Sequence, residues 1–174
     1  MNNIKKFIIF LLALFIFVPS AYSENQIVYL DLDSLVSNTK AGKTILNRLE
    51  KSKKDALSKF EKKEKELKNI DNEIKSQKNI ISEEELKKKL VEFRKEISTF
   101  NKEKQKVINE FNKKKKTEFE EFFKKITPII EKYVNEKKID MVLDKKNIFV
   151  ASKKKNITQE IIKIIDIEIK WAHH

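Results

Sequence analysis

The stretch Lys43–Lys138 decides the fold, and its two halves begin KTILNRLEKSKKDALSKF (43–60) and SEEELKKKLVEFRKEISTF (82–100). It contains no glycine, and Pro128 is its only proline. Globular helices usually run about 8–20 residues, so a helical pattern this long has to fold back on itself or extend as a coiled coil. Strand-like segments lie on both sides of it. We therefore expect helical arms that grow out of a small β-containing body.

Apolar residues recur at heptad spacing in the first half of this stretch. The assigned a positions are Leu46, Lys53, Phe60, Leu67, Ile74 and Ile81, and the d positions are Leu49, Ala56, Lys63, Ile70 and Gln77. Most of these side chains are apolar, and the long stems of lysine and glutamine can lie along a seam. The pattern predicts the first helix of an antiparallel hairpin, with its tip near residues 78–82.

The second half begins with a helix start signal. Ser82 followed by Glu83, Glu84 and Glu85 is a capping-box sequence, and three acids suit the positive end of a helix dipole. The apolar spacing then runs through Leu86, Leu90, Phe93, Ile97, Phe100, Lys104, Val107 and Phe111, and shifts to Phe119, Phe122, Ile126, Ile129 and Tyr133. We interpret the shift as the point where an arm over residues 43–118 becomes a body helix, which Pro128 should bend.

The segments at the two chain ends predict the body. Gln26–Asp33 (QIVYLDLD) alternates apolar and polar residues like a half-buried strand, and a short helical turn that opens at Ser34 follows it. Beyond the arm, Ile139–Asp144 (IDMVLD) and Asn147–Ser152 (NIFVAS) form the pattern of a β-hairpin, with its turn at Lys145–Lys146.

A last amphipathic helix, capped by Thr158 and running to about Trp171, completes the body. The predicted fold class is therefore α+β. Residues 24–42 and 119–174 build one small β body, and a long antiparallel coiled-coil hairpin is inserted in it.

Residues 1–23 have the pattern of a cleaved secretory signal peptide. Lys5 and Lys6 precede an unbroken apolar run, Phe7–Val18, and small residues stand where a signal peptidase reads. The run is shorter than the ~18 residues of a membrane span. We predict export and cleavage between Ser23 and Glu24, with an uncleaved anchor as the alternative.

The charge balance narrows the class of partner. The chain has 39 basic and 27 acidic residues, a formal net charge of +12, and +10 remains without the two lysines of the signal segment. Such a surplus attracts nucleic acid, anionic lipid or acidic protein surfaces, and export argues against nucleic acid. The chain has no cysteine, so packing or assembly with copies of itself has to supply its stability.

The sequence shows no catalytic constellation. His173 and His174 end the chain and most simply form a frayed tail, and Asp31 and Asp33 have strand-end or capping roles available. A chain with Gly42 as its one glycine cannot build a phosphate-binding loop. We predict a protein that is not an enzyme and uses no cofactor or metal.

Two other features are candidates for binding. Lys113, Lys114, Lys115 and Lys116 present positive charge around a helix and could hold the phosphates of anionic lipid or lipopolysaccharide, although a solvated charge run is the simpler interpretation. The rings of Phe60, Phe93, Phe100 and Phe111 lie along the arm seam. Two helices alone do not fully bury such side chains, so part of each ring remains available to a client.

Four short segments in this order resemble the Skp/OmpH family of periplasmic chaperones. Residues 26–36 (QIVYLDLDSLV) are similar to the family's opening strand, with Asp31 in the expected place, and residues 39–43 (TKAGK) to the turn before the arm. Residues 138–144 (KIDMVLD) are similar to an "IDLVVD"-type strand, and residues 156–160 (NITQE) to a "DIT" entry to the closing helix. The resemblance covers essentially the whole chain.

The resemblance implies a homotrimer whose helical arms project from an intersubunit β assembly and enclose a cavity. Family members bind unfolded outer-membrane proteins in the periplasm without ATP and keep them soluble. Lipopolysaccharide binding is attributed to basic arm residues of some members, and Lys113–Lys116 is the nearest candidate here. The alternative function is an envelope spacer or adaptor that docks one folded partner, and a nucleic-acid binder is a third class.

Overall fold

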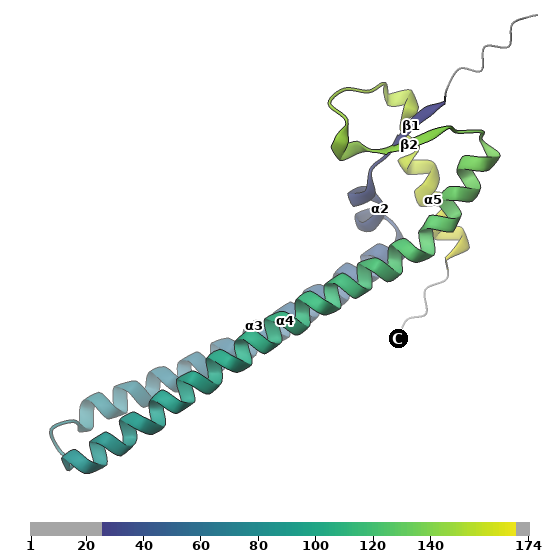
Figure 1. The fold of residues 1–174 in the computed structure, drawn as a ribbon. Coiled ribbons are helices and arrows are strands. Elements are labelled where there is room, and N and C mark those ends of the chain that lie inside the picture. Colours follow the sequence, from purple (N-terminus) through teal and green to yellow (C-terminus); the bar gives the residue numbers. More distant parts are fainter. Residues whose placement is uncertain (1–25, 170–174) are drawn as a thin grey trace, which may run out of the picture.

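The computed structural model describes residues 26–169 and shows a two-helix arm that projects from a small body (Figure 1). The elements in chain order are β1 (Ile27–Leu30), α2 (Leu32–Asn38), α3 (Lys40–Gln77), α4 (Glu83–Glu136), β2 (Met141–Asp144), the 3-10 turns η1 (Lys145–Asn147) and η2 (Lys153–Lys155), and α5 (Thr158–Glu168). The signal segment, its predicted cleavage site at Ser23–Glu24 and the terminal histidines lie outside the described residues. The predicted α+β class with an inserted helical hairpin is confirmed.

The arm consists of α3 and the first two thirds of α4, which run antiparallel along their length (Figure 1). At the turn between them, the Ser82 hydroxyl accepts a hydrogen bond from the Glu85 N–H at 3.2 Å, so the predicted helix start at Ser82 is confirmed. Beyond the base of the arm, Leu67, Ile74 and Phe100 are the buried residues of the seam, and its other positions are half-buried. Two helices therefore leave much of their seam partly open to solvent.

The predicted heptad is wrong at the base of α3. The a positions were assigned to Leu46 and Lys53, but both are exposed, whereas Ile45 and Leu49 are buried. The inward row runs Ile45, Leu49, Ser52, Ala56 and Phe60. It inserts one extra four-residue step into the heptad, which locally unwinds the pairing where α3 enters the body.

The body holds a two-stranded sheet in which β1 and β2 are parallel, with Val28 opposite Val142 and Leu30 opposite Asp144. The predicted hairpin of residues 139–152 is therefore wrong, since β2 pairs with the first strand of the chain. Asp144 instead caps η1 by accepting the Lys146 N–H at 3.1 Å. Without a glycine to form a tight turn, the chain leaves the strand in a 3-10 turn. The whole arm serves as the crossover that a parallel pair needs.

The core lies where α2, the base of α3, the last part of α4, α5 and the inner face of the sheet meet (Figure 1). Its fully buried side chains are Leu35, Ile45, Phe122, Ile126, Ile161 and Ile165. α4 continues through Pro128 and changes direction as it enters this body (Figure 1). Both chain ends thus contribute to one core, and the arm leaves from it.

The corner between α2 and α3 is tight. Thr39, which is fully buried, donates its hydroxyl proton to the Leu35 carbonyl at 2.7 Å and accepts the Gly42 N–H at 3.1 Å. A Cβ added to Gly42 would lie 1.9 Å from the Val36 carbonyl oxygen. Glycine is required here by the close approach of the two helices.

Candidate functional site

The arm is the largest surface of the molecule without a core behind it, and its apolar side chains were the first candidates for binding. Phe100 is only 7% exposed, and Phe60, Phe93 and Phe111 are half-buried. The rings of Phe60 and Phe100 meet edge to face with centroids 6.1 Å apart. These residues hold the two helices together, and only the outer part of the half-buried rings faces solvent.

A lysine covers this ring pair. The Lys104 Nζ lies 5.6 Å from the centroid of the Phe60 ring and 5.7 Å from that of Phe100, which is the geometry of a cation–π contact. The same ammonium forms an ion pair with Glu64 at 3.0 Å. Lys104 stands at a seam position, where its stem packs and its charge stays in water.

Other ion pairs join the two helices at the seam border. Lys63 of α3 contacts Glu96 of α4 at 3.3 Å and Glu66 of its own helix at 3.2 Å. The hydrogen bonds that its ammonium donates to Glu66 and Glu96 raise the pKa of Lys63. At the base, Arg48 pairs with Glu118 at 2.6 Å. The Arg48–Glu118 pair is partly buried, whereas the exposed pairs of Lys63 and Lys104 each contribute little and are screened by salt. The outer arm is therefore held by a thin apolar seam with weak electrostatic support.

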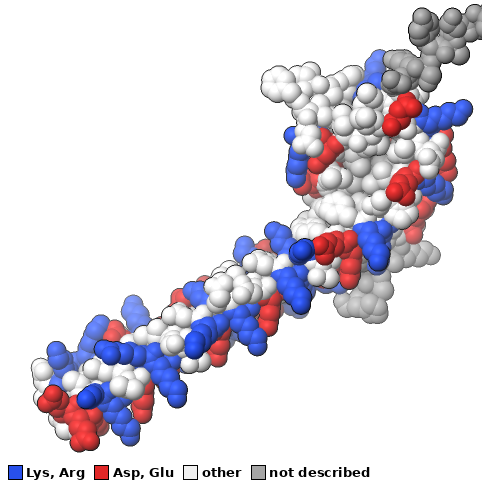
Figure 2. Space-filling view, in the orientation of Figure 1, with Lys and Arg blue, Asp and Glu red and all other residues white. Residues whose placement is uncertain are grey.

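Three apolar residues on the paired helices of the arm are exposed and were not among the predicted binding residues. Leu57 is 49% exposed, Val91 58% and Ile108 41%. They stand outside the heptad positions, which was the only sequence signal for them. Figure 2 shows the surroundings, where Lys and Arg alternate with Asp and Glu along the arm and leave uncharged surface between them. Such a surface offers many small apolar contacts beside charges.

The lysine run sits on α4 near the base of the arm, and all four of its side chains are exposed. Lys116 forms a loose pair with Glu120 at 3.7 Å. Lys113, Lys114 and Lys115 have no ion pair with any residue between 26 and 169. Their charges are available to an anion, although they point around the helix and do not converge on one point.

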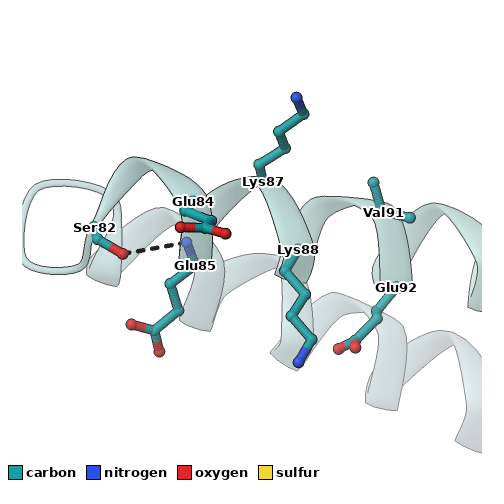
Figure 3. Close-up of a pocket in the computed structure, with 7 residues that line it drawn as sticks. All are labelled: Ser82, Glu84, Glu85, Lys87, Lys88, Val91 and Glu92. Carbon is teal, nitrogen blue, oxygen red and sulfur yellow. Dashed lines mark hydrogen bonds between the residues drawn. The ribbon is translucent and has the colours of Figure 1, made fainter.

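The tip carries a shallow depression on the first turns of α4, lined by Ser82, Glu84, Glu85, Lys87, Lys88, Val91 and Glu92 (Figure 3). In this view Lys87 and Lys88 extend to opposite sides of the helix. Both signs of charge border the exposed Val91 side chain. The arrangement fits a weak contact with a polypeptide better than the enclosure of a small molecule.

The body has an apolar surface of its own. The outer face of the sheet exposes Ile27, Met141 and Leu143, and in the segment after η1 Phe149 is fully exposed and Val150 is 80% exposed. A monomeric protein rarely leaves side chains of this size in water next to each other. The predicted strand at residues 147–152 was derived from these same apolar residues, but within one chain the segment has no strand partner.

Asp31 and Asp33, for which strand-end or capping roles were predicted, make structural contacts. Asp31 caps α2 by accepting the Ser34 N–H at 2.9 Å, and its backbone N–H donates to the Thr158 hydroxyl at 3.0 Å. The ammonium of Lys145 hydrogen-bonds the Asp31 carboxylate at 2.6 Å and, as the main cause, lowers its pKa. Asp33 pairs with Lys146 at 2.9 Å. The two carboxylates thus anchor η1 to the start of α2.

This network also corrects two predicted caps. Asp31, rather than Ser34, opens α2, and Thr158 makes no capping bond to its own helix, since its hydroxyl donates to Asn156 at 2.6 Å and accepts from Asp31. Local sequence could not show that the segments 127 residues apart meet.

The described residues hold no cluster of three or more His, Asp or Glu side chains that could bind a metal ion. Within residues 26–169, no helix has the length and apolar content to cross a membrane.

Comparisons with known proteins agree with this geometry. The family model of outer membrane proteins described as OmpH-like matches residues 26–165. A crystal structure from Caulobacter crescentus, of a candidate outer membrane chaperone (OmpH-like), is similar with a TM-score of 0.75 and 15% sequence identity. The similarity covers 86% of this chain and 88% of that one, and at this identity it shows the fold. A search of curated protein sequences gave no match.

Proposed function

This chain belongs to the OmpH-like family of outer membrane proteins, a chaperone family, and on that premise we propose that it is an ATP-independent holdase of the periplasm. It binds unfolded outer-membrane β-barrel proteins between helical arms and prevents their aggregation. It is not an enzyme and uses no cofactor. Binding consists of many weak contacts, whose combined avidity replaces a single strong site.

The arm is the observation that carries this proposal. Helices of 38 and 54 residues are far longer than the body core requires, and their surface alternates charge with exposed apolar side chains (Figure 2). Unfolded barrel precursors present alternating apolar residues, which match scattered apolar contacts. The basic surplus of the chain adds attraction for acidic clients.

Assembly with copies of itself is part of the proposal. The apolar surface of the body, formed by Ile27, Met141, Leu143, Phe149 and Val150, gives identical chains a face to bury. A two-stranded sheet is marginal alone and gains from added strands, and the segment 147–152 has the sequence of one. We propose a homotrimer in which these bodies join and three arms surround the client.

Anionic lipid or lipopolysaccharide is the proposed ligand of Lys113, Lys114, Lys115 and Lys116. Three of these side chains lack an ion pair within residues 26–169, which supports an anion role for them. Binding of this kind would bring the chaperone close to a membrane surface, with a strength that falls as salt rises.

Light scattering tests the function. A urea-unfolded outer-membrane barrel protein is diluted into buffer with the mature chain from Glu24 to His174, without ATP. Near-stoichiometric suppression of aggregation, weakened by high salt, is the expected result, with an unrelated basic helical protein of equal charge as control. Aggregation as fast as with that control would contradict the holdase proposal. The alternative, an adaptor that binds one folded partner, would then be favoured.

A further inference from the structure

The two flanks of the arm differ in charge, and three contacts identify them. On one flank, Lys63 of α3 pairs with Glu96 of α4, and Lys89 of α4 donates to Gln77 of α3. On the other flank, Lys104 of α4 reaches Glu64 of α3. Lys63 and Gln77 are d-type positions and Lys104 is an a-type position, so the contacts lie on opposite sides of the seam.

The first flank of α4 is acidic. Glu103 and Glu110 follow Glu96 at heptad spacing, and Glu92 stands four residues before it. Glu92, Glu96 and Glu103 border one shallow depression together with Thr99, Phe100 and the two lysines Lys63 and Lys95. Glu96 is paired with Lys63 and Glu110 with Lys106 at 4.0 Å, whereas Glu92 and Glu103 have no ion pair within residues 26–169 and would repel an acidic polypeptide.

The second flank of α4 carries no acid along five turns, and we name it the acid-free flank. Ile108 and Asn101 stand four residues after and three residues before Lys104, so they share its side of the helix. The exposed residues of this flank, all neutral or basic, are Val91, Arg94, Ser98, Asn101, Gln105 and Ile108. The helix thus sorts its acids to one side of the seam.

α3 adds an apolar residue to the acid-free flank and pairs two of its own acids there, while Glu61 on the same side is exposed and has no ion pair within residues 26–169. Leu57 stands one heptad before Glu64 in the same row and is 49% exposed. Glu64 is paired with Lys104, and Asp71, one heptad further, is paired with Lys75 at 2.6 Å. Arg94 has no ion pair with any described residue, so its charge is available to a partner.

We propose that the acid-free flank, together with Leu57, is the surface that contacts the client. Its occupant is an unfolded, acidic polypeptide segment whose apolar side chains pack on Leu57, Val91 and Ile108 while its carboxylates approach Arg94. Charge complementarity selects this flank, because the α4 residues of the opposite one include four glutamates, of which Glu92 and Glu103 have no ion pair within residues 26–169. The inference deepens the proposed holdase function and rests on it. The rings of Phe60 and Phe100 hold the two helices of the arm together, whereas the residues of the acid-free flank contact the client.

Site-directed crosslinking distinguishes the flanks. Because the chain has no cysteine, Asn101→Cys and Thr99→Cys each introduce a single thiol, and both positions are exposed on α4 with opposite orientation. Each variant, as the full mature chain, is labelled with the same benzophenone maleimide and irradiated with an unfolded acidic outer-membrane barrel protein. We expect at least about a fivefold higher crosslink yield from position 101. Equal yields, or a higher yield from position 99, would overturn the flank assignment.

A pair of charge variants gives an independent reading. Asn101→Glu places an acid on the acid-free flank, and Thr99→Glu adds the same charge to the acidic flank. The chaperone concentration for half-suppression of aggregation should rise several-fold for Asn101→Glu and stay within about twofold for Thr99→Glu. If both shift equally, the flank proposal fails while the holdase function stands. If the unchanged chain does not suppress aggregation, the holdase function fails, and this inference fails with it.

Discussion

Single residues determine where helices meet in this molecule, and Gly42 is the strictest case. It lets the start of α3 pass against the Val36 carbonyl, which a Cβ would approach to 1.9 Å. Because the opposing atom belongs to the backbone, it cannot move aside like a flexible side chain. The close contact between α2 and the start of α3, from which the arm extends, therefore depends on the absence of a Cβ atom at Gly42.

Gly42→Ala should destabilise the body by about 2–3 kcal/mol through overpacking, despite the better helix propensity of alanine. Urea denaturation followed by circular dichroism measures the change in the free energy of unfolding. Lys43→Ala, at the exposed neighbouring position, is the matched control and should change it by less than about 0.5 kcal/mol. A Gly42→Ala protein as stable as the unchanged one would mean that α2 sits further from α3.

Asp31 links stability to pH. Its pKa is lowered from 3.8, chiefly by the hydrogen bond from Lys145 and then by the Ser34 N–H. A group with a lowered folded pKa stabilises the fold above its unfolded value, and this contribution is lost as the pH falls from about 4 through the folded value.

The urea midpoint of the unchanged chain should therefore drop between pH 5 and pH 2.5, and Asp31→Asn should lower the midpoint at pH 7 and flatten this acid drop. The amide can still accept the Ser34 N–H, so helix capping is largely kept. Asp55→Asn, at an exposed α3 position without an ion pair within residues 26–169, is the control and should keep the acid drop. If the urea midpoint of Asp31→Asn dropped at acid pH as much as that of the unchanged chain, Asp31 would not be the source of the pH dependence.

The arm as an element is held by a seam only two helices thick. Leu67, Ile74 and Phe100 are its buried residues beyond the body, and its lysines keep their charges in water. Each seam layer therefore carries a large share of the local stability, and the arm can open without unfolding the core.

Phe100→Ala should cost about 3 kcal/mol of local stability, because a buried ring and its edge-to-face contact with Phe60 are both lost. Hydrogen exchange measured by mass spectrometry should show faster exchange in the middle of α3 and α4 and unchanged protection in α5. Ile108→Ala, which truncates a side chain 41% exposed, should leave exchange nearly unchanged. Uniform acceleration in arm and body would show that the arm is not an independent unit.

At the scale of the whole molecule, we expect the apolar surface of the body to determine whether the protein is a monomer with one arm or an oligomer with several arms. Phe149 and Val150 are the most exposed large apolar side chains of the body. The proposed trimer depends on burying them.

Phe149→Ser combined with Val150→Ser should lower the mass measured by light scattering at micromolar concentration from a trimer to a monomer. Aggregation suppression should also weaken, since avidity is lost. Leu57→Ser, on the arm, is the control and should keep the mass unchanged. An unaltered mass for the double variant would place the assembly interface elsewhere.

The features that the sequence determined by itself are those with a local physical cause. The absence of glycine and the heptad spacing predicted a long helical hairpin, Ser82 marked the start of α4, and the alternation of Gln26–Asp33 marked a strand. Each signal depends on residues a few positions apart.

Tertiary structure alone decided the rest. β2 pairs parallel with β1 rather than with the segment after it, Ile45 replaces Leu46 at the seam base, and Thr158 serves Asp31 instead of its own helix. The acid-free flank also follows from the relative placement of two helices. In each case the partner is distant in sequence, and the periodicity of one segment says which residues are apolar but not which surface will cover them.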